Sequence, residues 1–402
     1  MGVVRQFARD ASMPAILAGI VSTLIAFAGP AVIVFQAVSI LPADVVASWV
    51  WAISIGSGLL CVALSLRYRA PVVIAWSIPG SVLLLTLLPT VDYAVAIGAY
   101  VVAAVAILAV GLSGAFDRIV AKLPPAITAA MLAGILFGFA TNLFVGMAAQ
   151  PLLVLAMFLA FFIGRRWFPR YAVVAVLVTG LVVALATGQI GGPLPPLQAT
   201  IPSWVTPRFE WQAIVNISVP LFVVALTGQF VPGVALLRNS GYAHVPASPL
   251  VGWSGASSAL LAPFGCHGLT LAAVTAAICT APEAHPDPRK RYVAGVAAGL
   301  TYFVLGCFAT TVLALFASLP DALVATLAGL ALFPAIVNAL ATTLATPDDR
   351  DAALVTFIVS ASGMSLVGIG AAFWGLVLGL VVHALLHWRR ARARVPASTS
   401  TR

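Results

Sequence analysis

The chain has 402 residues, of which 62% are hydrophobic and only 8% are charged, and its formal net charge is +9. Charged residues make up about 25% of a typical soluble domain, so this composition excludes the soluble globular class. Apolar runs long enough to cross a bilayer, about 20 residues each, follow one another from Met13 to Trp388. We therefore predict an all-α polytopic integral membrane protein.

The predicted spans are read as apolar runs between charged residues and Pro or Gly breaks. There are fourteen, centred near residues 14–36, 45–66, 71–88, 93–112, 124–146, 150–164, 171–187, 213–236, 247–262, 264–281, 292–317, 320–343, 352–366 and 369–388. The first run is too long for the apolar part of a cleaved signal peptide and is expected to be retained. Several runs are short for a full span, so counts of twelve or thirteen stay open as alternatives.

Basic residues give the predicted orientation of these spans. With fourteen spans and a cytoplasmic N-terminus, every one of the 20 Lys and Arg residues except Arg208 falls in a cytoplasmic segment. Basic residues retained on the cytoplasmic side set the topology of membrane proteins. The positive charge is thus a topology signal, and nucleic-acid binding is not expected. We place the Pro-rich loop 191–211 outside and the basic tail 389–402 inside, where contact with anionic lipid is the alternative to a simple stop-transfer flank.

Cofactor and metal motifs are not found in the sequence. The four cysteines, Cys61, Cys266, Cys279 and Cys307, are scattered without the spacing of metal ligands, and a phosphate-binding Gly loop is absent. We expect no cofactor, no metal and no enzyme. An intramembrane thiol enzyme built on Cys266 and His267 is disfavoured, because neighbouring residues rarely present both side chains to one reacting atom.

An internal repeat is indicated by two segments that match at one constant offset. The segments "LPPAITAAMLAGILFGFATN" (123–142) and "LPDALVATLAGLALFPAIVN" (319–338) share Leu, Pro, Ala, Phe and Asn at equivalent places. They are predicted spans 5 and 12, and repeats with an odd number of spans insert with opposite topology. We therefore predict two inverted seven-span repeats, at 1–190 and 212–388.

Two further segments, again seven spans apart, are interrupted in the middle. Span 3 reads "APVVIAWSIPGSVLLL" (70–85) and span 10 reads "LLAPFGCHGLTLAAV" (260–274). Pro removes a backbone donor and Gly weakens a helix, so each span is predicted to be an extended stretch followed by a half-helix, starting near Gly80 and near Gly268. Short interrupted spans at matching positions of two halves indicate a transporter's binding site.

The chemistry of this predicted site suits an anion. The free N–H groups and positive dipole ends of two half-helices would face one cavity, and no Lys, Arg, Asp or Glu lies in the middle of a predicted span. His267 is the only deep group that titrates near neutrality, and we assign it to proton coupling. The alternative is a neutral imidazole bonded to a backbone carbonyl of the broken span. His383 lies near the cytoplasmic end of the last span, where snorkelling explains it.

Other polar and aromatic residues complete the predicted substrate site. Trp76 either stacks on substrate or packs, and Gln229 is expected on a locally irregular part of span 8. Gln36 is either a site residue or an interfacial one, and Asn338, like its repeat mate Asn142, has helix–helix hydrogen bonding as the alternative. The predicted substrate-binding residues are Gln36, Trp76, Ser77, Gly80, Ser81, Gln229, Phe264, Gly265, Cys266, His267, Gly268 and Asn338.

A resemblance adds to this interpretation. At "SLRYRAPVVIAWSIPGSVLL", "APFGCHGLTLAAVTAAICTAPEAHPDPRKRY" and "LFPAIVNALA", the sequence resembles the bacterial benzoate/proton symporter family (BenE-type), over essentially the whole chain and including "VFQA" of span 1. That family is similar in fold to nucleobase transporters and anion exchangers. The resemblance implies fourteen spans in two inverted repeats, with a core domain from spans 1–4 and 8–11 and a gate domain from spans 5–7 and 12–14. It implies proton-coupled uptake of benzoate or a similar aromatic carboxylate, in the bacterial inner membrane.

One departure from the related fold affects the expected substrate. Uracil-type relatives use glutamates on spans 8 and 10, whereas this chain has Gly228 and Gln229 in the first place and residues 266–269 without a carboxylate in the second. This favours an anionic substrate, whose carboxylate would face the N–H groups near 77–81 and 266–270 and whose ring would lie against Trp76 and Phe264. A nucleobase or inorganic-anion carrier of the same fold and an anion channel remain alternatives. A homodimer is one candidate assembly.

Overall fold

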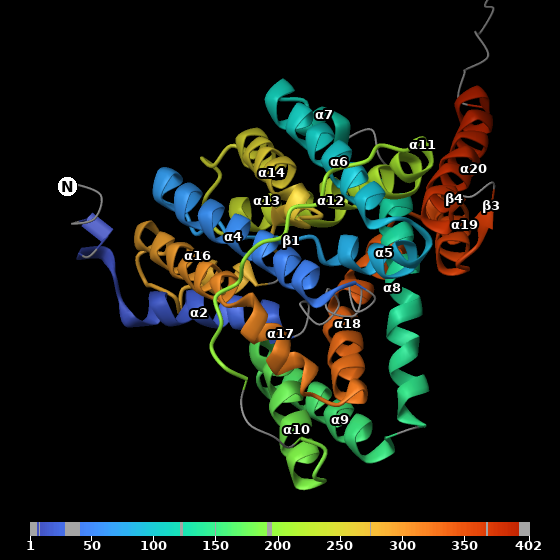
Figure 1. Ribbon diagram of the computed structural model, residues 1–402. Helices are drawn as coiled ribbons and strands as arrows, with labels where there is room; N and C mark the ends of the chain where they lie inside the picture. The colour runs from blue at the N-terminus through green and yellow to red at the C-terminus, as the bar shows by residue number, and fades with distance from the viewer. Residues whose placement is uncertain are drawn as a thin grey trace, which may run out of the picture.

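The chain is mostly helical in the computed structural model, which describes residues 6–7, 9–28, 41–120, 124–148, 150–190, 195–273, 275–366 and 369–393 (Figure 1). The α-helices are α2 (Met13–Ala28), α4 (Ala43–Tyr68), α5 (Ile78–Leu87), α6 (Tyr93–Ser113), α7 (Phe116–Val120), α8 (Pro125–Met147), α9 (Pro151–Trp167), α10 (Ala172–Ala186), α11 (Trp211–Ala213), α12 (Val219–Ala225), α13 (Val231–Asn239), α14 (Ala247–Leu261), α15 (Ala276–Thr280), α16 (Tyr292–Cys307), α17 (Ala309–Ala317), α18 (Asp321–Ala345), α19 (Arg350–Ala361) and α20 (Ala371–Ala393). The 3₁₀ and π turns are η1 (Leu88–Thr90), η2 (Pro169–Tyr171), η3 (Ile214–Ser218), η4 (Leu226–Phe230), η5 (Ala262–Phe264), η6 (Pro288–Lys290) and η7 (Pro347–Asp349), and the strands are β1 (Ile74–Trp76), β2 (Leu269–Leu271), β3 (Ser365–Leu366) and β4 (Ile369–Gly370).

Several of these helices are long and apolar enough to cross a membrane. Within the described residues they are Ala43–Tyr68, Tyr93–Ser113, Trp211–Asn239 and Asp321–Ala345, and the pair Pro288–Cys307 and Ala309–Ala317 forms a further span if its 75° bend is counted as one broken helix. Other apolar helices, such as α2 and α10, are shorter. The protein is therefore a multi-pass membrane protein, and the count of fourteen spans stays a prediction.

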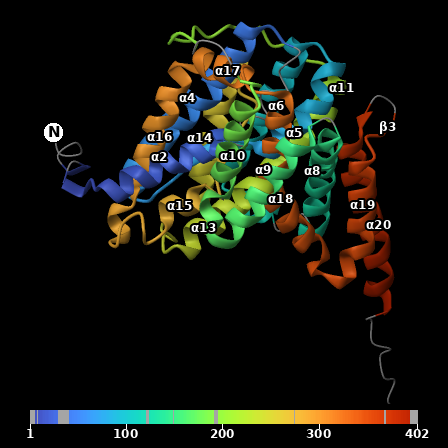
Figure 2. The same ribbon diagram turned by 90° about the horizontal axis from the view of Figure 1, so that it is seen from below.

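The helices pack in two groups. In one group α16 lies against α2 and α4, and α14 lies against α6; in the other α8 lies against α18 and α19, α19 against α20, and α9 against α10. Figures 1 and 2 show α2, α4 and α16 on one side of the molecule and α19 and α20 at the opposite edge. The crossing of α4 and α16 depends on two glycines, because a Cβ at Gly58 would lie 2.8 Å from the carbonyl oxygen of Gly299, and one at Gly299 would lie 2.7 Å from that of Gly58. Small residues at such crossings let the backbones of membrane helices approach closely.

The two interrupted segments meet as a pair of short antiparallel strands. β1 pairs with β2 in the register Ile74↔Leu271, Ala75↔Thr270 and Trp76↔Leu269, and all six residues are buried. Extended backbone inside a membrane protein needs partners for its N–H and C=O groups, and each strand supplies them to the other. The prediction of an extended stretch in span 3 is confirmed.

The half-helices differ from the prediction, one slightly and one strongly. The first is α5, which starts at Ile78 rather than at Gly80, because Ser77 caps it: the Ser77 hydroxyl accepts from the N–H of Gly80. The prediction that a half-helix begins near Gly268 is wrong. The chain continues as β2, and the next helix begins only at Ala276. The reason is that the amides here already have partners outside a helix, since Leu269 N–H donates to Ser258 Oγ and Ala272 N–H donates to the carbonyl of Val73.

The long helical segment Trp211–Asn239 contains two π turns, η3 and η4. The second covers Gln229, so the predicted local irregularity at this residue is confirmed. π turns inside α-helices occur frequently at functional sites.

Candidate functional site

His267 is held by three hydrogen-bonding groups at the crossing of the two interrupted segments. The indole N–H of Trp49 donates to its Nδ1 at 2.9 Å. Its Nε2 lies 3.1 Å from the carbonyl oxygen of Ser77 and 2.9 Å from the hydroxyl of Ser81. Because an indole nitrogen only donates and a carbonyl oxygen only accepts, Nδ1 is unprotonated and Nε2 carries the hydrogen. In this conformation the imidazole is therefore a neutral, satisfied tautomer.

The surroundings of the imidazole are dry and aromatic. His267 is 3% exposed, and Trp49, Ser81 and Tyr100 are fully buried. The ring of Trp49 lies 5.3 Å from the imidazole centroid, and Tyr100 meets it edge-on at 6.4 Å. The hydroxyls of Tyr93 and Tyr100, whose rings both pack on Trp49, are buried without a hydrogen-bond partner among the described residues. Buried polar groups are rarely left unpaired, so these hydroxyls are available to a bound molecule.

The backbone amides predicted to face an anion are largely occupied. At the start of α5, Gly80 N–H donates to Ser77 Oγ at 3.1 Å, and Ser77 N–H donates to the carbonyl of Gly268 at 3.0 Å. In the second segment, the N–H of Cys266 donates to the carbonyl of Leu261 at 3.2 Å. The expected pair of facing helix N-termini is thus corrected to one capped helix, α5, and a strand.

Gly265 sets the position of the turn before His267. Its φ is +105°, a conformation that L side chains rarely adopt. A Cβ at this position would also lie 2.8 Å from the Cα of Trp49 and 2.9 Å from the Tyr93 hydroxyl. Gly265, a predicted site residue, therefore allows the turn to pack directly on α4 beside Trp49.

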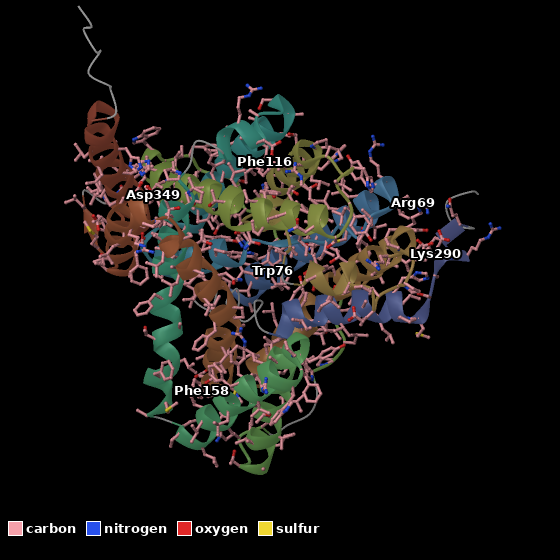
Figure 3. The ribbon with its side chains drawn as sticks, turned by 180° about the vertical axis from the view of Figure 1, so that it is seen from behind. Arg69, Trp76, Phe116, Phe158, Lys290 and Asp349 are labelled. Atoms are coloured by element: carbon pink, nitrogen blue, oxygen red, sulfur yellow. The ribbon has the colours of Figure 1, made fainter. Side chains whose placement is uncertain are left out.

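The two aromatic residues predicted to hold a substrate ring lie in different surroundings. Trp76, labelled near the centre of the molecule in Figure 3, meets Phe27 and Tyr302 edge-on at 5.3 Å and 5.9 Å, and its indole N–H has no partner among the described residues. Phe264 instead meets Trp51 at 5.6 Å and Trp204 of the Pro-rich loop at 5.3 Å. The structure thus places Trp76 in the buried core and Phe264 next to the Pro-rich loop.

The remaining predicted residues are dispersed. Gln229 is half-buried on η4, which contacts β2 and α8. Asn338 is exposed on α18 and is therefore not part of the buried site around His267. Cys266 is buried beside His267. Gln36 lies outside the described residues, and so does the side chain of Asn142.

Some residues of the site were not predicted. Trp49 was read as part of an apolar span, although a buried indole N–H usually has a hydrogen-bond acceptor. The sequence does not show which residue supplies that acceptor. Ser258 was missed because its role is to hold the amide of Leu269, which requires the tertiary pairing. The interpretation of His383 as a snorkelling residue missed its partner, because its Nδ1 lies 3.0 Å from a carboxylate oxygen of Asp349.

A separate hollow of about 710 Å³ opens on the side predicted to be cytoplasmic. It is lined by Gln6, Asp10, Arg69, Gly241, Tyr242, His244, Asp287, Pro288, Arg289 and Lys290. None of the residues around His267 lines it, so it is distinct from the predicted substrate site.

The helical membrane fold with two short strands paired among the helices is similar to that of membrane transporters of known structure. The chain is similar to the solved structure of SLC26A9, with a TM-score of 0.63 and 13% identity over 94% of this chain. It spans 65% of the SLC26A9 chain. It is also similar to the transmembrane domain of a cyanobacterial bicarbonate transporter, BicA, with a TM-score of 0.57, 14% identity, and 93% and 96% of the two chains covered. A murine structure of the former is described as an anion transporter in the inward-facing state (TM-score 0.62, 15% identity, 94% and 68% covered). At these identities the likeness is one of fold.

Sequence relatives then define the family. The benzoate membrane transport protein family matches residues 9–385, and the chain belongs to this family. It is 40% identical over 387 residues to the benzoate membrane transport protein of Acinetobacter baylyi, covering 96% of this chain and 98% of that one. It is 38% identical over 376 residues to the inner membrane protein YdcO of Escherichia coli, covering 93% and 96%. The predicted resemblance is confirmed.

Proposed function

We propose that the protein is a secondary transporter that takes up benzoate, or a similar aromatic carboxylate, together with a proton across the bacterial inner membrane. Family membership and the name of the relative from Acinetobacter baylyi support the substrate class. The fold neighbours described as bicarbonate and anion transporters support an anionic cargo. The observation that carries the proposal is the titratable imidazole of His267, buried at the β1–β2 crossing and contacted only by uncharged groups among the described residues.

The proton and the carboxylate are proposed to enter the site as a pair. Nδ1 of His267 is the imidazole nitrogen that can accept a proton, and the indole N–H of Trp49 now occupies it. A proton on Nδ1 would therefore displace the indole. The imidazolium N–H and the freed indole N–H are then two donors for one carboxylate, and the unpaired hydroxyls of Tyr93 and Tyr100 are two more.

Charge balance explains why such a site would lack a fixed cation. An isolated charge in a low-dielectric interior is very costly, whereas a carboxylate bound to an imidazolium enters as a neutral pair. Loss of the proton on the cytoplasmic side would return His267 to the neutral tautomer described here and release the anion. A permanent cation would hold the carboxylate equally well on both sides.

Alternating access is proposed to move one helix group against the other. The proposed core domain comprises spans 1–4 and 8–11 and contains the residues around His267, and the proposed gate domain comprises spans 5–7 and 12–14. Two facts support fourteen spans in inverted seven-span repeats: the strands β1 and β2 pair antiparallel, and α8 and α18, the predicted spans 5 and 12, begin at equivalent places of the internal repeat. In this proposal Trp76 and Gln229 line the path of the aromatic ring.

Uptake of radiolabelled benzoate into proteoliposomes with an alkaline interior tests this proposal. Protein-free liposomes are run in parallel, because benzoic acid also crosses lipid unaided. We expect the wild type to accumulate benzoate above that background. His267→Gln, which cannot form the imidazolium, is expected to bind benzoate more weakly and to lose gradient-driven accumulation. His244→Gln, a change at an exposed histidine, is the matched control and is expected to behave as wild type.

A different experimental result would contradict each part of the proposal. Uptake equal to that of protein-free liposomes would overturn the substrate, and competition by nucleobases or inorganic anions would then identify a carrier of another cargo. Saturable uptake that never exceeds equilibrium would indicate a channel or uniporter. Normal accumulation by His267→Gln would leave the substrate in place and overturn the role of the imidazole.

A further inference from the structure

Three potential ligands for a metal ion converge at the far end of the molecule from the proposed substrate site. Asp349 ends the turn η7 between α18 and α19, and His383 and His387 lie one turn apart on α20. The carboxylate oxygen and one ring nitrogen from each histidine all lie within 4.8 Å of one another. Asp349 Oδ1 is 3.0 Å from His383 Nδ1 and 3.6 Å from His387 Nε2. Figure 3 labels Asp349 beside the ribbon of α20.

The hydrogen bond of His387 shows which of its ring nitrogens is left to bind a metal ion. Nδ1 of His387 lies 3.0 Å from the backbone carbonyl oxygen of His383. A carbonyl oxygen only accepts, so Nδ1 carries the hydrogen, and Nε2 of a neutral ring presents its lone pair. That nitrogen lies 3.6 Å from Asp349 Oδ1, which is also an acceptor. Two acceptors this close need a proton or a metal ion between them.

The facing atoms of His383 and Asp349 also lack hydrogen-bond partners. Although their facing atoms are 3.0 Å apart, Asp349 Oδ1 and His383 Nδ1 are both buried and make no hydrogen bond with any described residue. Asp349 is 8% exposed, and because its Oδ1 atom is buried, bulk water does not satisfy this oxygen. A carboxylate oxygen and two imidazole nitrogens thus lie within 4.8 Å of one another, and no hydrogen bond to a described residue satisfies Asp349 Oδ1 or His383 Nδ1.

We propose that Asp349, His383 and His387 bind a single divalent transition-metal ion of the zinc type. Zinc takes imidazole nitrogen at about 2.0–2.1 Å and carboxylate oxygen at about 2.0–2.2 Å, which sets tetrahedral ligand atoms roughly 3.3 Å apart; the two distances here, 3.0 and 3.6 Å, bracket that value. Histidines four residues apart on one helix face form a common zinc-binding pair. The bond from His387 to a backbone carbonyl is the outer contact that fixes the tautomer of a metal-binding histidine.

The class of metal follows from the donors and their exposure. Imidazole suits zinc, copper, nickel and iron, whereas calcium and magnesium prefer all-oxygen sites. The side chains of His383 and His387 are 25% and 41% exposed, which leaves an entry path and room for a water as fourth ligand. The ion would tie α20 to the turn after α18, and thereby fix the C-terminal helix to the rest of its group.

Isothermal titration with Zn²⁺ tests the site. The full chain is purified in detergent, its affinity tag is removed, and bound metal is stripped with a chelator before titration. We expect one equivalent of Zn²⁺ to bind, and His383→Ala and His387→Ala each to weaken binding at least about tenfold. The controls His244→Ala and His285→Ala, which leave this cluster intact, are expected to bind as wild type. Size-exclusion chromatography verifies folding, and His383→Asn and His387→Asn replace any alanine variant that fails to fold.

Titration with Co²⁺ provides a second readout, since its visible absorption reports on the ligands directly. We expect bands typical of tetrahedral or five-coordinate cobalt in the wild type and their loss in the double variant His383→Ala/His387→Ala. Zinc binding well below one equivalent, or equal binding by that double variant and the wild type, would overturn the proposal. The cluster would then be a salt bridge between Asp349 and protonated histidines. Neither result depends on which substrate the protein transports.

Discussion

The indole of Trp49 and the imidazole of His267 form a hydrogen bond of 2.9 Å between residues 218 positions apart. The bond joins α4, in the first half of the chain, to the turn that precedes β2 in the second half. It also fixes the imidazole in its neutral tautomer, because the donor occupies Nδ1. Any proton arriving at Nδ1 has to break this contact, so the proposed coupling involves two side chains rather than one.

Trp49→Phe is expected to impair transport without unfolding the protein. The change keeps a ring against Tyr93 and Tyr100 but removes the indole N–H, and a lost hydrogen bond at a buried site costs about 1–3 kcal/mol. We expect benzoate affinity, measured by the concentration dependence of uptake, to fall about tenfold, the equivalent of ~1.4 kcal/mol. Trp51→Phe is the control, since Trp51 is half-buried and packs on Phe264. Equal behaviour of the two variants would contradict a role for the indole N–H.

Ser77→Ala is expected to destabilise the fold more than Ser81→Ala. Ser77 caps α5 through its hydroxyl, and loss of such a cap costs about 1 kcal/mol. Ser81→Ala removes one of two oxygen atoms next to His267 Nε2 and leaves the Ser77 carbonyl in place. Thermal unfolding in detergent measures both. Ser57→Ala is the control, because the buried Ser57 hydroxyl has no partner among the described residues; a reversed order of Ser77→Ala and Ser81→Ala would refute the cap.

Gly265→Ala is expected to prevent correct folding. A side chain there meets both an unfavourable φ of +105° and the backbone of Trp49 at 2.8 Å. At Gly114, whose φ is +63°, a Cβ would meet nothing within 4 Å. Gly114→Ala should therefore cost only about 1–2 kcal/mol, the conformational term alone. We expect the yield of monodisperse protein to collapse for Gly265→Ala and to persist for Gly114→Ala, and similar yields would argue against the close packing of this turn on α4.

Tyr242 is expected to make the protein sensitive to alkaline pH. Burial raises the pKa of Tyr242, partly opposed by Arg291, and the phenol donates to the carbonyl of Pro288 at 2.8 Å. A raised pKa means that the neutral phenol stabilises the folded state below pH ~10, the unfolded value, and that this contribution is lost as the pH rises through the folded-state pKa.

The comparison of wild type with Tyr242→Phe isolates this group from the other tyrosines. At neutral pH the variant should be about 1 kcal/mol less stable, because it lacks the hydrogen bond. The difference should shrink as the pH is raised above about 10, as followed by thermal unfolding in detergent. A constant difference across that range would show that the phenol does not titrate with unfolding.

The features set by local chemistry were predictable from the sequence. The apolar composition predicted the membrane class, and the Pro and Gly residues of the segment 70–85 predicted an extended stretch followed by a helix. Ser77 and Pro79 then determine the start of α5, since serine is a good cap and proline fits the first turn. These are properties of a few neighbouring residues, and no distant contact overrides them.

The features that depend on tertiary pairing were not predictable. A half-helix after Gly268 was a reasonable expectation from glycine alone. However, the hydroxyl of Ser258 and the carbonyl of Val73, just before β1, accept from amides of this segment. Likewise, the sequence shows only that His383 is near the end of a span. Its distance of 3.0 Å from Asp349 is known only from the structure. One sequence without known contacts does not reveal which distant group will occupy a donor or an acceptor.

The pairing of β1 with β2 has a consequence for biogenesis. The first strand leaves the ribosome nearly two hundred residues before its partner, and unpaired backbone groups in lipid cost several kcal/mol each. The nascent first half therefore has to keep the 72–77 segment in water, in the translocation machinery or against a chaperone until the second half has been made. A chain truncated before Leu269 should accordingly be a substrate for membrane quality control, even where its own helices have inserted correctly.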